Sequence, residues 1–271
     1  MKSELYIALI ALALLSGGCI EKSYSNTQDA YDLQYDLNNG DVFFYNVLAT
    51  IEKPSTEVSE ETSIHVAEIK NDNINLKVSV DSTVGNALSK EDYSLNMTSR
   101  GTINDVNSNN LIIPEIQPEL VSILEFPDKQ ITEGDVWYSY FNKNASQVVD
   151  GNLFEYSIIG NTTYKCIGFE NILVTAGKFD CATIETNTTY ILDISSVSNN
   201  KTVSLKTVGN TFGEKWIDLN KGVLIKSEYY VDKNVQSNYS DVYKDIGIKN
   251  AYREIPMKSY IVTELLSVNG D

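Results

Sequence analysis

Apolar and polar residues alternate along most of the chain after residue 41, which predicts β-strands. Between Ile74 and Val80 every second residue is apolar, the period of two expected for a sheet with one dry and one wet face. Similar runs, bounded by turn residues, predict further strands at 42–51, 62–70, 92–99, 135–142, 153–168, 179–192, 202–208, 212–218, 223–231 and 257–267. Because their spacing is short, hairpins are favoured over crossover connections. We therefore predict a mainly β, curved antiparallel sheet.

Turn and helix signals complete this expected architecture. Glycine-containing turns tolerate a positive φ, and three of them separate predicted strands: Asn39–Asp41, Ala176–Lys178 and Asn220–Gly222. One helix is expected to begin at Pro118 and to end before Pro127, because proline suits a first helical position and stops continuation. This helix would cap or plug the curved sheet. A second short helical turn is expected near 241–247.

The N-terminus has the layout of an export signal. Lys2 precedes an apolar run, Leu5–Leu15, which is shorter than the roughly 20 residues needed to span a bilayer. The following segment, Leu15–Cys19, resembles the lipobox of prokaryotic lipoproteins, in which a peptidase cuts before a cysteine that carries lipid. The resemblance implies a signal peptide at 1–18 and a lipid on Cys19. The alternative is a simple secretory signal that contains a cysteine.

These features predict the domain organisation and the location of the protein. Residues 19–40 are polar and rich in turn residues, so we expect a lipid-anchored tether. Residues 41–268 contain no Gly- or Pro-rich linker and are expected to form a single β-rich domain. The protein is expected outside the cytoplasm, anchored to the surface of the cell membrane. One acyl chain binds membranes only marginally, so stable anchoring implies two chains or a second contact.

The strong negative charge narrows the range of partners. The 271-residue chain has a formal net charge of −16, and removal of residues 1–18 leaves it unchanged because Lys2 and Glu4 are both lost. Such a surface repels nucleic acid and anionic lipid headgroups. We expect the membrane, through the N-terminal lipid, and a hydrophobic ligand or an envelope protein as partners, and no nucleic acid.

Besides Cys19 the chain has two cysteines, Cys166 and Cys181, an even pair in a protein expected to meet an oxidising compartment. A disulfide between them would stabilise the fold by about 3 kcal/mol on the loop-entropy estimate. A simple hairpin turning at 176–177 would place Cys181 opposite Ile172, so the bond would require a bulge near Gly168. Two buried free thiols are the alternative.

The sequence contains six N-glycosylation sequons, only slightly more than chance would give a chain rich in Asn, Ser and Thr. In an exported protein each is a candidate acceptor. They begin at Asn96, Asn144, Asn161, Asn187, Asn200 and Asn238.

Residues 126–231 carry a family resemblance. Its steps are an aromatic residue after Gly-Asp at 134–137, Ala-Gly-Lys-Phe-Asp at 176–180, and Trp-Ile-Asp at 216–218 followed by Gly-Val at 222–223. Together they resemble an uncharacterised family of prokaryotic, in particular archaeal, surface lipoproteins whose domains are similar to Lol-type lipoprotein carriers. The resemblance implies a half-barrel, a curved antiparallel sheet wrapped around a helix, and a surface location. It implies no catalytic residues.

No arrangement of residues typical of catalysis is found. His65 is the only histidine, which excludes sites with several histidine ligands and limits nucleophile–histidine relays to that one residue. No nucleophile elbow or phosphate-binding loop is present. We therefore expect no enzyme activity, no catalytic residue, no metal and no cofactor.

Two functions remain open. One is a binding module whose concave face holds a lipid or an acylated partner, with Trp137 and Trp216 as candidate walls of the cavity. The other is a structural or interaction protein of the cell envelope, whose cavity is filled by its own side chains. For both tryptophans, packing in the core is the alternative to ligand contact. An apolar cavity open to solvent would favour the first function.

Overall fold

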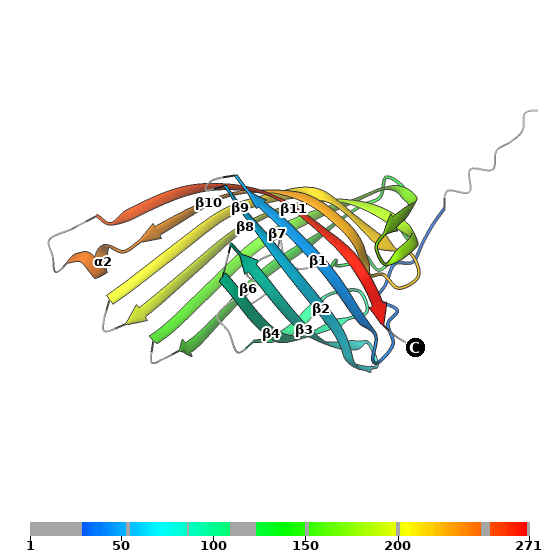
Figure 1. The fold of residues 1–271 in the computed structure, drawn as a ribbon, viewed down its shortest axis with the longest axis horizontal. Coiled ribbons are helices and arrows are strands. Elements are labelled where there is room, and N and C mark those ends of the chain that lie inside the picture. Colours follow the sequence, from blue (N-terminus) through cyan, green and yellow to red (C-terminus); the bar gives the residue numbers. More distant parts are fainter. Residues whose placement is uncertain are drawn as a thin grey trace, which may run out of the picture.

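One curved antiparallel sheet makes up nearly all of the structure, which is a computed structural model (Figure 1). It describes residues 29–52, 55–85, 87–108, 123–149, 152–198, 201–244 and 250–269. The strands are β1 (Val42–Ile51), β2 (Thr56–Lys70), β3 (Asn73–Val84), β4 (Ala87–Thr98), β5 (Ile103–Ser108), β6 (Val136–Val149), β7 (Asn152–Val174), β8 (Gly177–Ser198), β9 (Lys201–Asp218), β10 (Leu224–Asn238) and β11 (Tyr252–Asn269).

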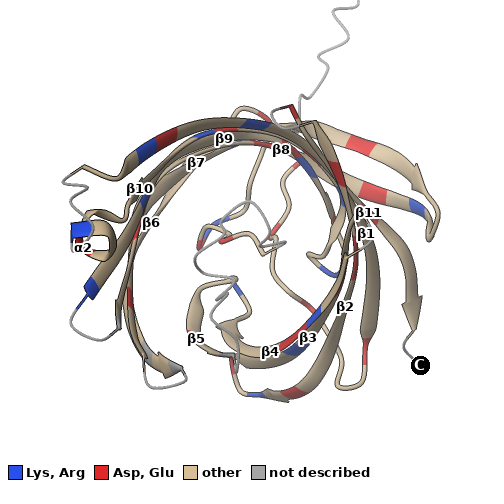
Figure 2. Ribbon diagram, turned by 60° about the vertical axis from the view of Figure 1, so that its left-hand side comes forward, with Lys and Arg blue, Asp and Glu red and all other residues tan. Residues whose placement is uncertain are grey.

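The order of the strands explains the half-barrel shape. The sheet runs β5-β4-β3-β2-β1-β11-β10-β9-β8-β7-β6, so the first and last strands pair with each other in its middle, and β5 and β6 form its two edges. Figure 2 shows the sheet curled into an open ring around other segments of the chain. The predicted fold class, a mainly β half-barrel of antiparallel strands, is confirmed. We call the gap between the edge strands β5 and β6 the seam.

The predicted strands are present, several of them longer than predicted, and there are two further differences. The runs 202–208 and 212–218 form one strand, β9, since Gly209 continues the ladder opposite Tyr190 and Lys233. A side chain on Gly209 would come within 2.3 Å of the Tyr190 ring. This glycine therefore permits a close approach within a strand and does not mark a turn. Strand β5 was not predicted, because its six residues show no clear alternation.

The two predicted helices have different outcomes. The helix expected from Pro118 lies largely outside the described residues, and its described end, residues 123–127, is irregular. A short helix, α2 (Ser240–Tyr243), confirms the helical turn expected near 241–247. Residues 245–249 lie outside the described part. Among the residues that the structure describes, no helix is long and apolar enough to cross a membrane.

Two extended segments, residues 31–37 and 123–131, occupy one end of the concave face, and we call them the plug. They are joined by a pair of backbone hydrogen bonds between Tyr31 and Ile131, of 3.0 and 2.8 Å. Leu33 and Leu124 are 1% and 0% exposed. The prediction of a tether at 19–40 is therefore wrong for its described part. The plug segment before β1 belongs to the folded domain, which thus begins before residue 41.

The plug holds the main hydrophobic core against the sheet. The Tyr35 hydroxyl accepts a hydrogen bond from the Leu124 backbone N–H at 2.8 Å, and burial raises the pKa of Tyr35. A smaller cluster lies farther along the concave face of β7 and β8, formed by Tyr156, Ile158, Tyr190 and Leu192 with Phe141 packed against them. The inner face between the two clusters is not filled by the plug.

Candidate functional site

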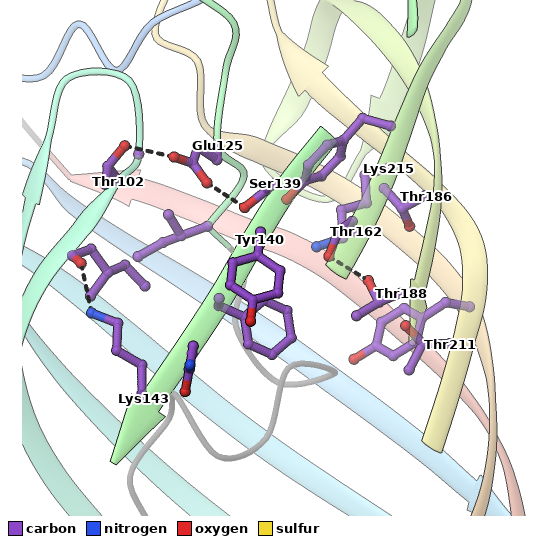
Figure 3. Close-up of a pocket in the computed structure, with 17 residues that line it drawn as sticks. Thr102, Glu125, Ser139, Tyr140, Lys143, Thr162, Thr186, Thr188, Thr211 and Lys215 are labelled. Atoms are coloured by element: carbon purple, nitrogen blue, oxygen red, sulfur yellow. Dashed lines mark hydrogen bonds between the residues drawn. The ribbon is translucent and has the colours of Figure 1, made fainter. Parts of the chain in front are cut away.

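A cavity of about 480 Å³ lies between these two clusters, on the concave face beside the seam (Figure 3). Its walls come from β6 to β10 and from the chain on the other side of the seam. The residues lining it are Gly101, Thr102, Ile103, Ile123, Glu125, Ser139, Tyr140, Phe141, Asn142, Lys143, Thr162, Tyr164, Thr186, Thr188, Thr211, Lys215 and Tyr229.

A row of hydroxyl side chains crosses the floor of this cavity. Ser139, Thr162, Thr188 and Thr211 lie directly opposite one another in the ladders of β6, β7, β8 and β9, and we call them the hydroxyl row. Its three threonines are 7–8% exposed. The hydroxyl oxygens of Thr162 and Thr188 are 2.8 Å apart and hydrogen-bonded. Because a hydroxyl both donates and accepts, the floor can hydrogen-bond a polar group of either kind.

Three charged side chains share the cavity. Glu125 of the plug accepts hydrogen bonds from the hydroxyls of Thr102, at 2.8 Å, and Ser139. The Lys143 ammonium donates to the backbone carbonyl of Ile103 at 3.3 Å, across the seam. Lys215 points into the cavity from β9 (Figure 3), and burial lowers its pKa to about 8. At neutral pH the lysine is still mainly protonated, so the described side chains lining the cavity include two cations and one anion.

The apolar surface of the cavity comes mainly from aromatic and branched side chains: Ile103, Ile123, Phe141, Tyr164 and Tyr229. Tyr164 stacks on Trp137 with ring centroids 5.3 Å apart, which fixes the wall nearest the plug. Burial, with a smaller effect from the Glu125 carboxylate, raises the pKa of Tyr164 to about 12. The tyrosine is therefore neutral at physiological pH.

The mouth of the cavity lies at the seam. Tyr140 and Asn142 are exposed residues of β6, yet both line the cavity together with Phe141 and Lys143. Since successive residues of a strand point to opposite faces, the cavity must reach the edge of β6. Tyr140 is 67% exposed. The cavity thus borders the edge of the sheet, where β5 and β6 are not hydrogen-bonded to each other.

The two tryptophans predicted as cavity walls have different positions. Trp137 is 8% exposed and donates from Nε1 to the Glu125 carbonyl at 2.8 Å; it packs behind Tyr164 and does not itself line the cavity. Trp216 lies on the convex face, where its Nε1 donates to Glu170 at 2.8 Å and the Lys226 ammonium lies 5.2 Å from its ring. The prediction of Trp216 as a wall is wrong, because strand alternation turns the adjacent Lys215 inward.

The predicted disulfide between Cys166 and Cys181 is also wrong in this structure, since both are free and buried. Cys166 lies opposite Ile184, whereas Cys181 lies three residues farther along β8. At about 3.3 Å per residue this offset is about 10 Å, which exceeds the roughly 7 Å limit for bonded Cα atoms. The expected bulge next to Gly168 is present but does not close the gap. Burial raises the pKa of both thiols, that of Cys181 to about 12.

The remaining predicted sites that fall within the described residues lie apart from the cavity. Asn144, Asn161, Asn187 and Asn238 are exposed, and Asn96 is half-buried, where its side-chain amide donates to Asn75 at 2.8 Å. Asn200, the signal peptide and Cys19 lie outside the described residues. His65 is exposed on β2. In the described ranges, no three His, Cys, Asp or Glu side chains gather closely enough to hold a metal ion.

Sequence reasoning missed both the hydroxyl row and Lys215. The one signal available was local: residues 185–189 of β8 are polar on both faces of the strand. A strand that is polar on the face turned toward a core would bury hydroxyls at a cost. Such a stretch therefore indicates a place where the inner face is left open.

No protein-family model matches the chain, and no curated protein matches it by sequence. Solved structures with some likeness include a candidate lipoprotein of Parabacteroides distasonis (16% identity, TM-score 0.36, covering 89% of this chain and 100% of that one). Another is a candidate exported protein with a YmcC-like fold from Bacteroides fragilis (9% identity, TM-score 0.36, covering 88% and 99%). A third is the hypothetical lipoprotein YmcC of Escherichia coli (9% identity, TM-score 0.21, covering 80% and 83%).

At these TM-scores the likeness supports no conclusion about this chain. Neither a relation to Lol-type carriers nor an archaeal origin follows from it. The half-barrel is established by the strand order and register of the protein's own sheet.

Proposed function

We propose that this protein is an extracytoplasmic lipoprotein, anchored to the membrane through Cys19, that binds a hydrophobic ligand in the half-barrel cavity. The ligand would be a lipid or the acyl group of a partner, and the protein would act by binding rather than by catalysis. The observation that carries the proposal is the cavity of about 480 Å³ at the seam. The N-terminal sequence supports the location.

The size and the lining of the cavity fit this role. Small-molecule sites are mostly concave, about 300–1,000 Å³ in volume, and apolar with a few placed polar groups. Here aromatic and branched side chains form the walls, and the hydroxyl row forms the floor. The plug fills one end of the half-barrel with leucine, phenylalanine and isoleucine side chains, and its residues Ile123 and Glu125 form one wall of this cavity without filling it. A half-barrel filled completely by the residues that the structure describes would have no such space.

A second candidate, an interaction protein of the cell envelope, is favoured by one feature of the convex face. Exposed aromatic side chains lie next to each other there: Phe212 is opposite Tyr230, and Tyr230 packs on Tyr260 with centroids 4.9 Å apart. Tyr230 is 63% exposed. Tyrosine gives contact area at low entropic cost, so this patch would suit a protein partner.

The test is native mass spectrometry of residues 20–271 purified without detergent, followed by organic extraction and lipid analysis. The proposal predicts a bound or readily acquired apolar molecule at a ratio of one per chain. An apo mass with no uptake of offered lipid would contradict it and favour the envelope interaction protein.

A matched pair of variants locates the binding. Thr188→Phe places a ring in the cavity, whereas Thr189→Phe places the same ring on the exposed convex face one residue away. Uptake should be lost in the first variant and kept in the second. Circular dichroism checks that both are folded, because overpacking costs about 1–3 kcal/mol. Equal uptake by both variants would place the ligand elsewhere.

A further inference from the structure

The buried part of the cavity is both polar and apolar. On the floor Thr188 and Thr211 are 7% exposed, as buried as the aromatic residues Tyr164 and Tyr229 beside them, at 7% and 6%. The apolar side chains Ile103 and Phe141, together with the exposed Tyr140, lie toward the seam. A purely apolar ligand would displace water from the hydroxyl row without replacing the hydrogen bonds that water makes there, which disfavours binding. An occupant with a polar end directed inward satisfies both regions.

The positive charge of Lys215 indicates that the polar end of the ligand is negatively charged. Gly213 precedes Lys215 by two residues on the same face of β9. It has no side chain that could separate the lysine from the cavity. Figure 3 shows Lys215 on the same side of the cavity as Thr162 and Thr186. A buried ammonium group beside hydroxyl donors is a favourable environment for an anion, because charge-assisted hydrogen bonds are about twice as strong as neutral ones.

The other charged side chains of the cavity also favour an anionic ligand. Among the residues that the structure describes, Glu125 is the one carboxylate that lines the cavity, and its two oxygens accept hydrogen bonds from the hydroxyls of Thr102 and Ser139. Together with Lys143 and Lys215, the described side chains that line the cavity carry one net positive charge, although the whole chain carries −16. These two lysines thus create a local site for an anion inside an otherwise acidic protein.

We propose that the ligand is an amphiphile with one anionic head group, which lies against Lys215 and the hydroxyl row while its apolar chain leaves through the seam past Ile103 and Phe141. This inference rests on the proposed binding function and adds the class of ligand and its orientation. The shared chemistry is a carboxylate or phosphate attached to an alkyl chain.

The experiment measures displacement of the neutral fluorescent probe N-phenyl-1-naphthylamine from residues 20–271. The competitors are laurate, dodecyl phosphate and dodecanol, which share one alkyl chain and differ in the head. Each is titrated against the wild type, Lys215→Met, and the control Lys165→Met. Lys165 is on β7 but exposed on the convex face. The laurate and dodecyl phosphate titrations distinguish a carboxylate from a phosphate head.

The expected result is that an anionic competitor binds the wild type more tightly than dodecanol does. Lys215→Met should weaken that anion by about 10- to 100-fold, the range for a lost charged hydrogen bond, and leave dodecanol unchanged. Lys165→Met should change neither. If dodecanol binds as well as both anions and Lys215→Met affects none of them, the head-group inference is overturned and the binding function stands. If no probe or competitor binds at all, the binding function itself fails.

A measurement on the wild type keeps the inference testable if Lys215→Met does not fold. The preference for laurate over dodecanol should decline between pH 7 and pH 9.5, because Lys215 has a pKa of about 8 and loses its proton in this range. Tyr164, with a pKa of about 12, stays neutral. A preference that stays constant over this range would overturn the assignment to Lys215. Among the described residues, the ionisable groups that line or adjoin the cavity are Glu125, Tyr140, Lys143, Tyr164, Cys166, Lys215 and Tyr229.

Discussion

Replacing Lys215 by methionine should stabilise the ligand-free protein. Methionine keeps an unbranched apolar stem of similar length but removes the ammonium group. Burial lowers the pKa of Lys215 from its ordinary value of 10.5 to about 8. Each pKa unit corresponds to about 1.4 kcal/mol, so the charged amine costs the folded state about 3 kcal/mol. Lys215→Met should therefore raise the free energy of unfolding at pH 7 by up to about 3 kcal/mol.

The stability difference between the wild type and Lys215→Met should depend on pH, which ties the prediction to the charge of Lys215. Below about pH 8 the amine is protonated in both the folded and the unfolded chain, so the full cost is present. Between pH 8 and pH 10.5 only the unfolded chain keeps the proton, and the stability of the wild type rises with pH. The difference between wild type and variant should thus be largest at pH 7 and vanish above about pH 10.5. The tyrosines that titrate at high pH are common to both proteins and cancel.

Urea unfolding followed by tryptophan fluorescence, at pH 7, 8.5 and 10.5, measures this difference. Lys165→Met is the control, since an exposed lysine on the same sheet should change stability by less than about 0.5 kcal/mol. A Lys215→Met variant less stable than wild type at pH 7, or a gain that does not depend on pH, would refute the reasoning. A confirmed gain would mean that the buried cation is retained at a cost to stability, as residues at functional sites often are.

Three further predictions concern the plug, a buried ion pair and the thiols. Leu33→Ala should lower the free energy of unfolding by about 3 kcal/mol, since Leu33 is 1% exposed; a loss below 1 kcal/mol in urea unfolding would contradict its place in the core. Lys221→Met should cost about 2 kcal/mol, because it removes the 2.7 Å ion pair of Asp41, whose side chain is 2% exposed; an unchanged urea midpoint would argue against the pair. Alkylation of the unfolded, non-reduced protein should label both Cys166 and Cys181, whereas a mass without label would indicate a disulfide.

The sheet itself was predictable because its signals are local. Alternation of apolar and polar residues at 74–80, for example, needs only neighbouring residues to be read, and in the structure Ile74, Leu76 and Val78 are 2–3% exposed. The short polar turns between strands indicated hairpins. Residues 202–218 were predicted as two strands because the sequence does not distinguish Gly209, which lies within β9, from a glycine in a turn. Its role depends on the ring of Tyr190 from the next strand.

The plug shows the opposite situation. Leu33, Tyr35 and Leu37 alternate with polar residues and so carried a strand-like signal, yet they pair with no strand of the sheet. What buries them is the concave face, built by residues far along the chain: the Tyr35 backbone N–H donates to Ser99 at 2.7 Å. Local polarity alone made this stretch look like a tether.

The sequence by itself determined the strand periodicity, the antiparallel connections and the excess of negative charge, because each of these can be read without knowing which distant residues come together. Only the tertiary structure decided which face of β9 is inside. Lys215 points into the cavity and Trp216 points out, the reverse of what hydrophobicity suggests. Alternation of apolar and polar residues shows that the two faces of a strand differ. Where both faces carry polar residues, the curvature of the sheet and the extent of the plug decide which face borders the cavity.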